Sequence, residues 1–232
     1  RSSKSLQTIR KQTKQHTTRT KHGANQMTAA SLPNGWAFLT LENFTSNENN
    51  AIKRGPFGSA IKKEYFVPSG YKVYEQKNAI YNDFNIGNYF INESKFQELK
   101  DFAVKPGDII ISCSGTIGKL AIIPQNAPKG IINQALLKLS LDTRIILTKY
   151  FSYLFTSDFF QKKVLKNTRG TAIKNLESVK ALKQIPFPIA PLNEQKRIIN
   201  KVELLFSFLD AGVAQLRLVQ GQLKRYRQAV LK

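Results

Sequence analysis

The segment from Gly107 to Ile123, GDIIISCSGTIGKLAII, places hydroxyl groups and a lysine in a short loop between two apolar runs. Hydroxyls, backbone amides and lysines are the groups that hold phosphate oxygens and base edges in nucleic-acid complexes. Glycines at 115 and 118 would let a ligand approach the backbone closely. A tight turn whose glycines serve only backbone geometry would fit the same residues. The loop side chains that could contact a ligand are Ser112, Ser114, Thr116 and Lys119.

Two kinds of enzyme chemistry are poorly supported at this loop. A nucleotide-binding P-loop ends in Gly-Lys followed by Ser or Thr, whose hydroxyl binds magnesium, but here Lys119 is followed by a leucine. A nucleophilic Cys113 or Ser114 needs an adjacent base, yet the only histidines, His16 and His22, lie in the polar N-terminal segment. With one cysteine we expect no zinc site and no internal disulfide, and the single thiol fits a reducing compartment.

Two further clusters combine cations, hydroxyls and glycines. KRGPFGSAIKKEY, residues 53–65, surrounds a Gly-Pro-Phe-Gly turn with four cations, and NTRGTAIKNL, residues 167–176, has an arginine and a lysine beside a glycine. A solvated basic loop and a plain helix-to-strand connection are the alternatives. Arg and Lys can read guanine edges, and Asn or Gln can read adenine. Predicted phosphate contacts are Lys53, Arg54, Lys62, Lys63, Lys77, Lys119 and Lys174, and predicted base or mixed contacts are Ser59, Gln76, Asn78, Ser112, Ser114, Thr116 and Arg169.

The net charge favours a polyanionic partner. The chain has 36 Lys and Arg against 15 Asp and Glu, which gives +21. A surplus of this size favours nucleic acid and, less often, an anionic membrane face, although a generally basic protein would also show it. No apolar run approaches the ~20 residues that a membrane span needs. We therefore expect a soluble protein with no membrane partner.

The elements that must position these loops divide the chain into three segments. Residues 1–31 carry seven Lys or Arg and no acid, which predicts a basic linker or the end of a spacer region, with a transit peptide as the alternative. Residues 32–192 are apolar enough to form the globular domain. A turn is predicted at 33–35. Short runs bounded by Gly, Pro and Asn predict strands at 37–41, 71–75, 108–112, 119–123 and 136–141.

Helical periodicity appears twice. Apolar residues at i, i+3 and i+4 predict a helix over 143–166, broken near Ser157 and Asp158. Because strands and helices are mixed without regular alternation, we expect an α+β (mixed α/β) domain rather than a doubly wound sheet. A long C-terminal coiled-coil helix should follow over 193–232. Prolines 186, 188 and 191 precede it in an extended approach, Asn193 is its predicted cap, and Glu194 lies in its first turn.

The C-terminal helix carries a heptad seam. A helix of this length, roughly 55–60 Å, cannot bury such a stripe on the domain alone, so a second helix from this chain or another must cover it. The alternative is a helix lying flat on its own domain. Gly212 is the one gap in the 3,4 spacing, and the seam residues are Val202, Leu205, Leu209, Leu216, Val219, Leu223, Tyr226 and Val230.

The order of these motifs resembles the specificity subunits of type I restriction–modification systems. The resemblance extends from Leu32 to Lys232. It is carried, in order, by LPNGW, GPFGSAIKKEYFVPSGYKVYEQKNAI, KPGDIIISCSGTIGKLAII, INQALLKL, RGTAIKNLESVKALKQIPFPIAPLNEQKRI, and a long helix ending QLKRYRQAVLK.

This resemblance implies a target recognition domain at 32–192 that binds duplex DNA, and one conserved spacer helix at 193–232. A full subunit of the family has two such domains and two helices, which pair antiparallel as a molecular ruler. Methylation and cleavage belong to separate subunits. We therefore expect a non-catalytic, cytoplasmic prokaryotic subunit that reads one half of a bipartite target. It would dock methyltransferase subunits, which bring S-adenosylmethionine, and through them meet the restriction subunit.

Several possibilities stay open at this point. The chain could be the second half of a longer subunit or a half-size subunit that pairs with another copy, and its start at Arg1 favours a fragment. An RNA-binding accessory protein with a coiled-coil helix is the main alternative, in which Phe57, Tyr65 and Tyr74 would stack on unpaired bases. An enzyme that binds a phosphorylated small molecule at the Ser114–Lys119 loop is another. No cofactor or metal is expected in the chain itself.

Overall fold

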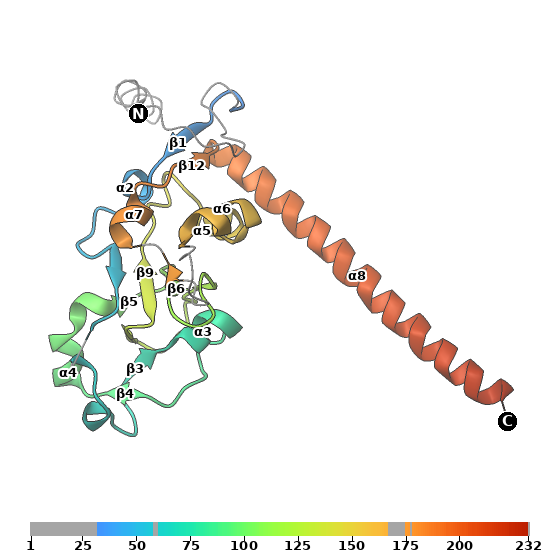
Figure 1. Ribbon diagram of the computed structural model, residues 1–232, viewed down its shortest axis with the longest axis horizontal. Helices are drawn as coiled ribbons and strands as arrows, with labels where there is room; N and C mark the ends of the chain where they lie inside the picture. The colour runs from blue at the N-terminus through green and yellow to red at the C-terminus, as the bar shows by residue number, and fades with distance from the viewer. Residues whose placement is uncertain (1–31, 58–59, 167–174, 177, 232) are drawn as a thin grey trace. The chain divides into compact units, whose positions relative to one another are not determined.

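The computed structural model describes residues 32–57, 60–166, 175–176 and 178–231. Residues 1–33 and 34–232 form separate units, and the predicted basic linker at 1–31 lies outside the described residues. The second unit mixes short strands with short helices and ends in one long helix (Figure 1). This arrangement confirms the expected α+β class.

The first four-stranded sheet holds the two apolar strands that flank the chemistry-bearing loop. Neighbouring strands in it are all antiparallel. Its two central strands are buried at every position, which agrees with their mostly apolar sequences, although Lys138 lies within β9 and Ser112 ends β6. The strand order is β2 (Ile52–Arg54), β9 (Leu136–Leu139), β6 (Ile109–Ser112) and β7 (Leu120–Ile122).

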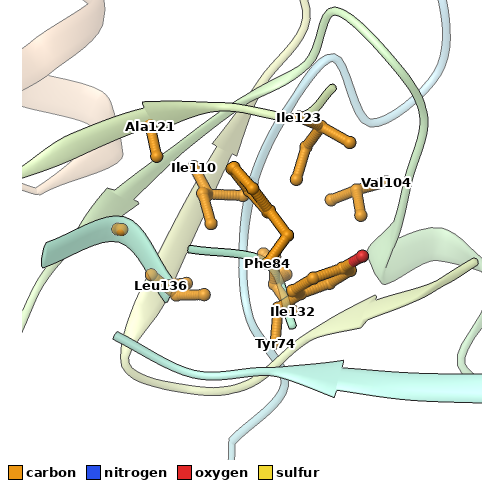
Figure 2. Close-up of a cluster of buried hydrophobic side chains, with 9 residues drawn as sticks. Tyr74, Phe84, Val104, Ile110, Ala121, Ile123, Ile132 and Leu136 are labelled. Carbon is orange, nitrogen blue, oxygen red and sulfur yellow. The ribbon is translucent and has the colours of Figure 1, made fainter. Parts of the chain in front are cut away.

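The second four-stranded sheet packs against the first. Its order is β4 (Phe90–Ile91), β3 (Tyr71–Tyr74), β8 (Gly130–Ile132) and β5 (Ala103–Val104), and only the central pair β3–β8 is parallel. A shared core joins the sheets, with Tyr74, Val104 and Ile132 from the second meeting Ile110 and Leu136 from the first (Figure 2). Burial of these side chains holds the strand ends, and so the loops, in fixed positions.

Short helices and strand pairs complete the domain. The helices are α2 (Leu41–Phe44), α3 (Gln76–Tyr81), α4 (Glu93–Glu98), α5 (Thr148–Thr156), α6 (Asp158–Val164) and α7 (Val179–Lys183), with 3-10 turns η4 (Lys63–Tyr65) and η5 (Lys100–Phe102). Strand β1 (Ala37–Leu39) pairs antiparallel with β12 (Phe187–Ile189), so segments 150 residues apart lie side by side (Figure 1). A small ladder joins β10 (Leu165–Lys166) to β11 (Asn175–Leu176).

The predicted helix over 143–166 is two helices, and its break at Ser157 is confirmed. The first of them begins at Thr148, five residues later than the predicted start at 143. The backbone amides of Ile145 and Ile146 donate to the Asp142 carbonyl, and the Arg144 amide donates to the Asp142 carboxylate at 3.0 Å. This turn uses the local N–H groups, so the helix begins only at Thr148.

The long helix α8 runs from Leu192 to Val230. Its cap is Pro191, whose carbonyl accepts from the amides of Glu194 and Gln195 at 2.9 Å, so the predicted cap at Asn193 is wrong. Tertiary contacts explain the earlier start. The fully buried Gln195 amide accepts from Leu147 N at 2.8 Å, and it donates to the carbonyls of Ile145 and Ala190 at 2.9 and 2.8 Å.

Among the described residues, no helix has the length and hydropathy that crossing a membrane requires.

The Gln195 network yields a stability prediction. Gln195→Met keeps the side-chain volume but leaves one buried amide and two carbonyls without their partner, so we expect a loss of about 1–3 kcal/mol in unfolding free energy. Urea denaturation followed by fluorescence measures it. Gln220→Met, at an exposed site on the same helix, is the matched control. Equal unfolding midpoints for the two variants would mean that Gln195 does not anchor the helix.

Candidate nucleic-acid interface

The β6–β7 loop has exposed polar side chains, and hydrogen bonds of a buried serine fix its backbone. The side chains of Ser114, Thr116 and Lys119 are exposed. Ser112 is fully buried, and its hydroxyl donates to the Thr116 carbonyl at 2.6 Å while it accepts from Lys119 N at 3.0 Å. The prediction that Ser112 contacts a ligand is therefore wrong, because its side chain is used to close the loop.

Two amide side chains from neighbouring helices lie beside the loop glycines. A Cβ built on Gly115 would lie 3.5 Å from Gln76 Nε2 of α3, and one on Gly118 would lie 2.6 Å from Gln161 Oε1 of α6. Gln161 also donates to the carbonyl of Phe155 at 2.8 Å, which fixes its position. The left-handed φ of +76° at Gly118 adds a second reason for glycine there. Gln161 also donates to the Gly118 carbonyl at 3.4 Å, so α6 is bonded to the loop while the side chain of Gln76 on α3 lies beside it.

The β8–β9 turn brings further strand ends to the same place. Asn133 N donates to the Tyr74 carbonyl at 2.9 Å, and the Ala135 carbonyl accepts from Cys113 N at 2.8 Å. A Cβ on Gly55 would lie 1.8 Å from the Asn133 carbonyl oxygen, so β2 also approaches this turn closely. The ends of β2, β3 and β6 therefore meet at residues 133–135. Gln134, in the centre of the turn, is exposed.

Gln134 was missed as a candidate contact. Its backbone carbonyl accepts from Arg54 Nε at 3.4 Å, so this residue adjoins the side chain of a predicted contact residue. The available signal was the INQAL segment, where two amides follow one apolar run and precede another. That pattern predicts a polar connection between strands, but only the tertiary fold shows that the connection adjoins the β6–β7 loop.

The predicted phosphate-binding cations differ in how free they are. Lys62 and Lys63 are exposed, and Lys62 makes a 3.5 Å ion pair with Glu64. Lys53 is half-buried between Asn50, at 3.0 Å, and Asp101, at 3.5 Å. The Lys77 ammonium lies 2.8 Å from Glu75. Exposed ion pairs are weak, so Lys62 can exchange its carboxylate for a phosphate more easily than Lys53 can leave its two partners.

Two further predictions are corrected by burial. Asn78 is fully buried and accepts from Glu75 N at 2.8 Å, so it cannot read a base. Tyr74, a stacking residue in the RNA-binding alternative, is also fully buried, and this burial raises the pKa of its hydroxyl to about 12. Burial likewise raises the pKa of the Cys113 thiol to about 11, which leaves no appreciable thiolate at neutral pH.

Three predicted contacts and one predicted stacking residue complete the comparison with the sequence. Ser59, Arg169 and Lys174 lie outside the described residues. Phe57 is 68% exposed, with the Arg54 guanidinium 5.8 Å from its ring centroid.

In the part of the chain that the structure describes, no group of three or more His, Cys, Asp and Glu side chains could hold a metal ion.

The family model for the type I restriction modification DNA specificity domain matches residues 33–216. The chain belongs to this family. The match includes every strand end that meets at the interface and continues into α8, which confirms the resemblance read from the motifs.

Individual relatives agree with this assignment. The specificity domain is 27% identical over 214 residues to the type I restriction enzyme EcoKI specificity subunit of Escherichia coli strain K12, covering 88% of this chain and 43% of the relative. Identity to the StySPI specificity subunit of Salmonella potsdam is 28% over 216 residues, with the same two coverages, 88% and 43%. The chain therefore spans less than half the length of these curated relatives.

Solved structures share the fold of the specificity domain. A structure from work on complex assembly and conformational transition of the type I R-M system matches with a TM-score of 0.62 at 18% identity, covering 89% of this chain and 47% of that one. The HsdS subunit from Thermoanaerobacter tengcongensis matches with a TM-score of 0.53 at 20% identity, covering 80% and 45%. Family membership does not favour the RNA-binding alternative.

Proposed function

We propose that this specificity domain binds duplex DNA and reads one half of a bipartite target sequence. The observation that carries the proposal is the meeting of the β2, β3 and β6 ends around the β8–β9 turn, in a chain of net charge +21. Membership of a DNA specificity family supplies the kind of nucleic acid. The exposed atoms at this meeting point are hydroxyls, amides and cations, the groups that contact phosphates and base edges.

Phosphate and base contacts would come from different residues. Exposed lysines neutralise phosphates and release counterions, which gives affinity for any sequence. We assign this role to Lys62, Lys63 and Lys119. Sequence is read by hydrogen bonds to base edges, for which amide and hydroxyl side chains are suited. We assign this role to the exposed or half-buried side chains Gln76, Ser114, Thr116 and Gln134, with Arg54 beside them.

Helix α8 would set the distance to the other half-site. Its 39 residues give about 58 Å at 1.5 Å per residue. From Leu204 to Leu231 every residue is exposed, including seam leucines such as Leu209 at 60% and Leu216 at 70%. Exposed apolar residues on a heptad pattern need a partner helix. We propose a second spacer helix as that partner, from the same full-length subunit or from another copy.

The first half of α8 has room for more than one helical partner. Phe206 and Phe208 flank the seam at heptad positions e and g and are 52% and 65% exposed. Apolar residues at these positions widen the face to the width typical of a helical bundle. We propose that methyltransferase subunits dock here and bring S-adenosylmethionine, with the restriction subunit bound through them. The specificity domain itself would perform no chemistry.

The phosphate role gives a salt-dependence prediction. Lys62→Glu with Lys63→Glu should weaken binding to every duplex sequence and lower the slope of log affinity against log salt by about 2. Fluorescence anisotropy with a labelled duplex across a salt series measures the slope. Lys196→Glu with Lys201→Glu, two exposed lysines on α8, makes the same change in net charge and is the control. Unchanged affinity at low salt in the first variant would remove residues 62 and 63 from the interface.

Sequence reading is tested with the natural partners. The chain should co-purify with its methyltransferase subunits, and sequencing of the DNA modified by that complex should show one bipartite motif. Single-stranded RNA should compete poorly with duplex DNA for the chain. Preference for the RNA would instead support the RNA-binding alternative.

A further inference from the structure

The connection between α3 and β4 is irregular but tied down from inside. The buried Asn78 side chain donates to the carbonyls of Asp83, at 2.8 Å, and Ile86, at 2.9 Å. The Lys72 ammonium donates to the carbonyls of Asn85, at 3.2 Å, and Gly87, at 2.8 Å. Four carbonyls within residues 83–87 therefore point inward, toward two side chains of the domain.

This arrangement places a charge in the interior. Lys72 is 2% exposed, and burial lowers its pKa. Taking an ammonium out of water is costly unless hydrogen bonds replace its hydration. The two loop carbonyls do this, and the ring of Phe90, with its centroid 5.3 Å from Nζ, adds a cation–π contact. Glu75, a nearby carboxylate, is paired with Lys77 at 2.8 Å. The hydrogen bonds of the Lys72 ammonium therefore fix the backbone of the loop at Asn85 and Gly87.

The loop backbone has further constraints of the same kind. Asn82 has a left-handed φ of +51°, and the Asn85 amide donates to the Asp83 carboxylate at 2.8 Å. A Cβ on Gly87 would lie 2.9 Å from Glu75 Oε2, and its φ of +95° already favours glycine. Hydrogen bonds and backbone geometry therefore constrain most of residues 82–87, although this segment contains no helix or strand.

The fixed loop displays amides and aromatic rings. The side chains of Asn82, Asn85 and Asn88 are exposed. Tyr81 and Tyr89, at its two ends, are 72% and 41% exposed, and Tyr89 stacks on Phe66 with ring centroids 4.4 Å apart. Asparagine can contact the N6 and N7 atoms of adenine with two hydrogen bonds, and it depends on a fixed backbone to do so.

Helix α3 connects this loop to the interface. Gln76, at the start of α3, lies beside Gly115 of the β6–β7 loop, and Tyr81 ends the helix where the fixed loop begins. Six residues of helix span about 9 Å, roughly the rise of three base pairs at 3.4 Å each. A duplex that contacts the β6–β7 loop could therefore reach the fixed loop within a few base pairs.

We propose that residues 81–89 form a base-reading loop, in which Asn82, Asn85 and Asn88 contact base edges, adenine in particular, and Lys72 and Asn78 are positioning residues. This inference rests on the proposed function, since it requires that the domain binds duplex DNA. It assigns Asn78 a role in reading DNA through the loop, although its own side chain is buried.

The test is selection of duplexes from a pool with a randomised segment, using the full chain. The wild type should enrich a short motif. Asn85→Ala with Asn88→Ala should lower the preference at one or two motif positions by roughly 5- to 150-fold, the range of one bidentate contact, and leave other positions unchanged. The salt dependence of binding should also stay unchanged, because no phosphate contact is lost. Asn126→Ala, an exposed asparagine between β7 and β8, is the matched control.

Lys72→Met tests the positioning role. It should flatten the same motif positions as the asparagine variant and speed amide hydrogen exchange at residues 83–88, whereas a merely stabilising lysine would affect all motif positions together. If Lys72→Met fails to fold, the exposed asparagine variants still decide the assignment. An unchanged motif in the Asn85/Asn88 variant would overturn the reading loop alone. A wild-type chain that binds duplexes without enriching any motif would overturn both the loop and the proposed sequence reading.

Discussion

Replacing Leu209 and Leu216 with aspartate should abolish pairing of α8 with the proposed partner helix while the domain stays folded. Both side chains are exposed in the isolated chain, so the changes remove no contact within the domain. Burying each leucine in an interface contributes about 1.5–3 kcal/mol, and a carboxylate in its place adds a desolvation cost. The two substitutions together should therefore weaken association more than a hundredfold.

Two measurements check this result. Analytical ultracentrifugation reports pairing between copies of the chain, and co-purification reports assembly with the proposed methyltransferase partners. Leu218→Asp is the matched control, because Leu218 is 52% exposed on the same helix but lies at heptad position c, away from the seam. Intact assembly in the double variant would reject the seam. An equal loss in Leu218→Asp would show that the partner does not distinguish the two faces of α8.

Local patterns predicted the elements whose causes are local, namely β1, β3, β6, β7, β9 and the helices α5, α6 and α8, but not the shorter strands and helices between them. Short apolar runs beside glycines predicted β6 and β7, and the helical spacing with Ser157 and Asp158 in its middle predicted two helices. The pairing of strands that are distant in the chain produces no such pattern in the sequence. Nothing in the sequence indicates that β3 and β8 are parallel neighbours, because that arrangement depends on how both sheets share one core.

The candidate site was predicted by composition and corrected by burial. Ser112 and Ser114 have the same chemistry two residues apart, yet the first ends a buried strand and the second begins an exposed loop. Gln76 and Asn78 differ in the same way. Asn78 lies on the buried face of α3, where its amide donates to carbonyls of the following loop. Lys72 was not among the candidate residues, because a lysine in a strand is usually exposed to solvent, whereas this one is buried. Which polar side chain turns inward is decided by tertiary packing, which a single sequence does not display.

The start of α8 illustrates the same limit. Asn193 has the better capping chemistry, but helix α8 begins at Leu192. The hydrogen bonds of Gln195 to residues 145, 147 and 190 decide the boundary, and these partners come from distant parts of the chain. A tertiary network of this kind outweighs a local preference of about 1 kcal/mol.

Gly55→Ala should damage stability and DNA reading together. The added Cβ would lie 1.8 Å from the Asn133 carbonyl oxygen and 2.9 Å from Gln134 N. Both are backbone atoms, so no side-chain rotation relieves the overlap, and either the end of β2 or the β8–β9 turn must move. Such overpacking costs about 1–3 kcal/mol, and more where the backbone resists. The same turn supports Cys113 N of the β6–β7 loop at 2.8 Å, so a shift there also displaces the proposed reading groups.

The two consequences of Gly55→Ala are separable. Urea denaturation should show the stability loss, and binding at temperatures where the variant is fully folded should show a larger loss of affinity for the cognate duplex than for unrelated duplexes. Gly221→Ala is the control, since a Cβ there meets nothing within 4 Å and alanine favours a helix over glycine by about 1 kcal/mol. If Gly55→Ala unfolds and binds like the wild type, the close approach of β2 to the β8–β9 turn does not hold the interface together. If stability falls while cognate preference is unchanged, the turn supports the fold but does not position the reading groups.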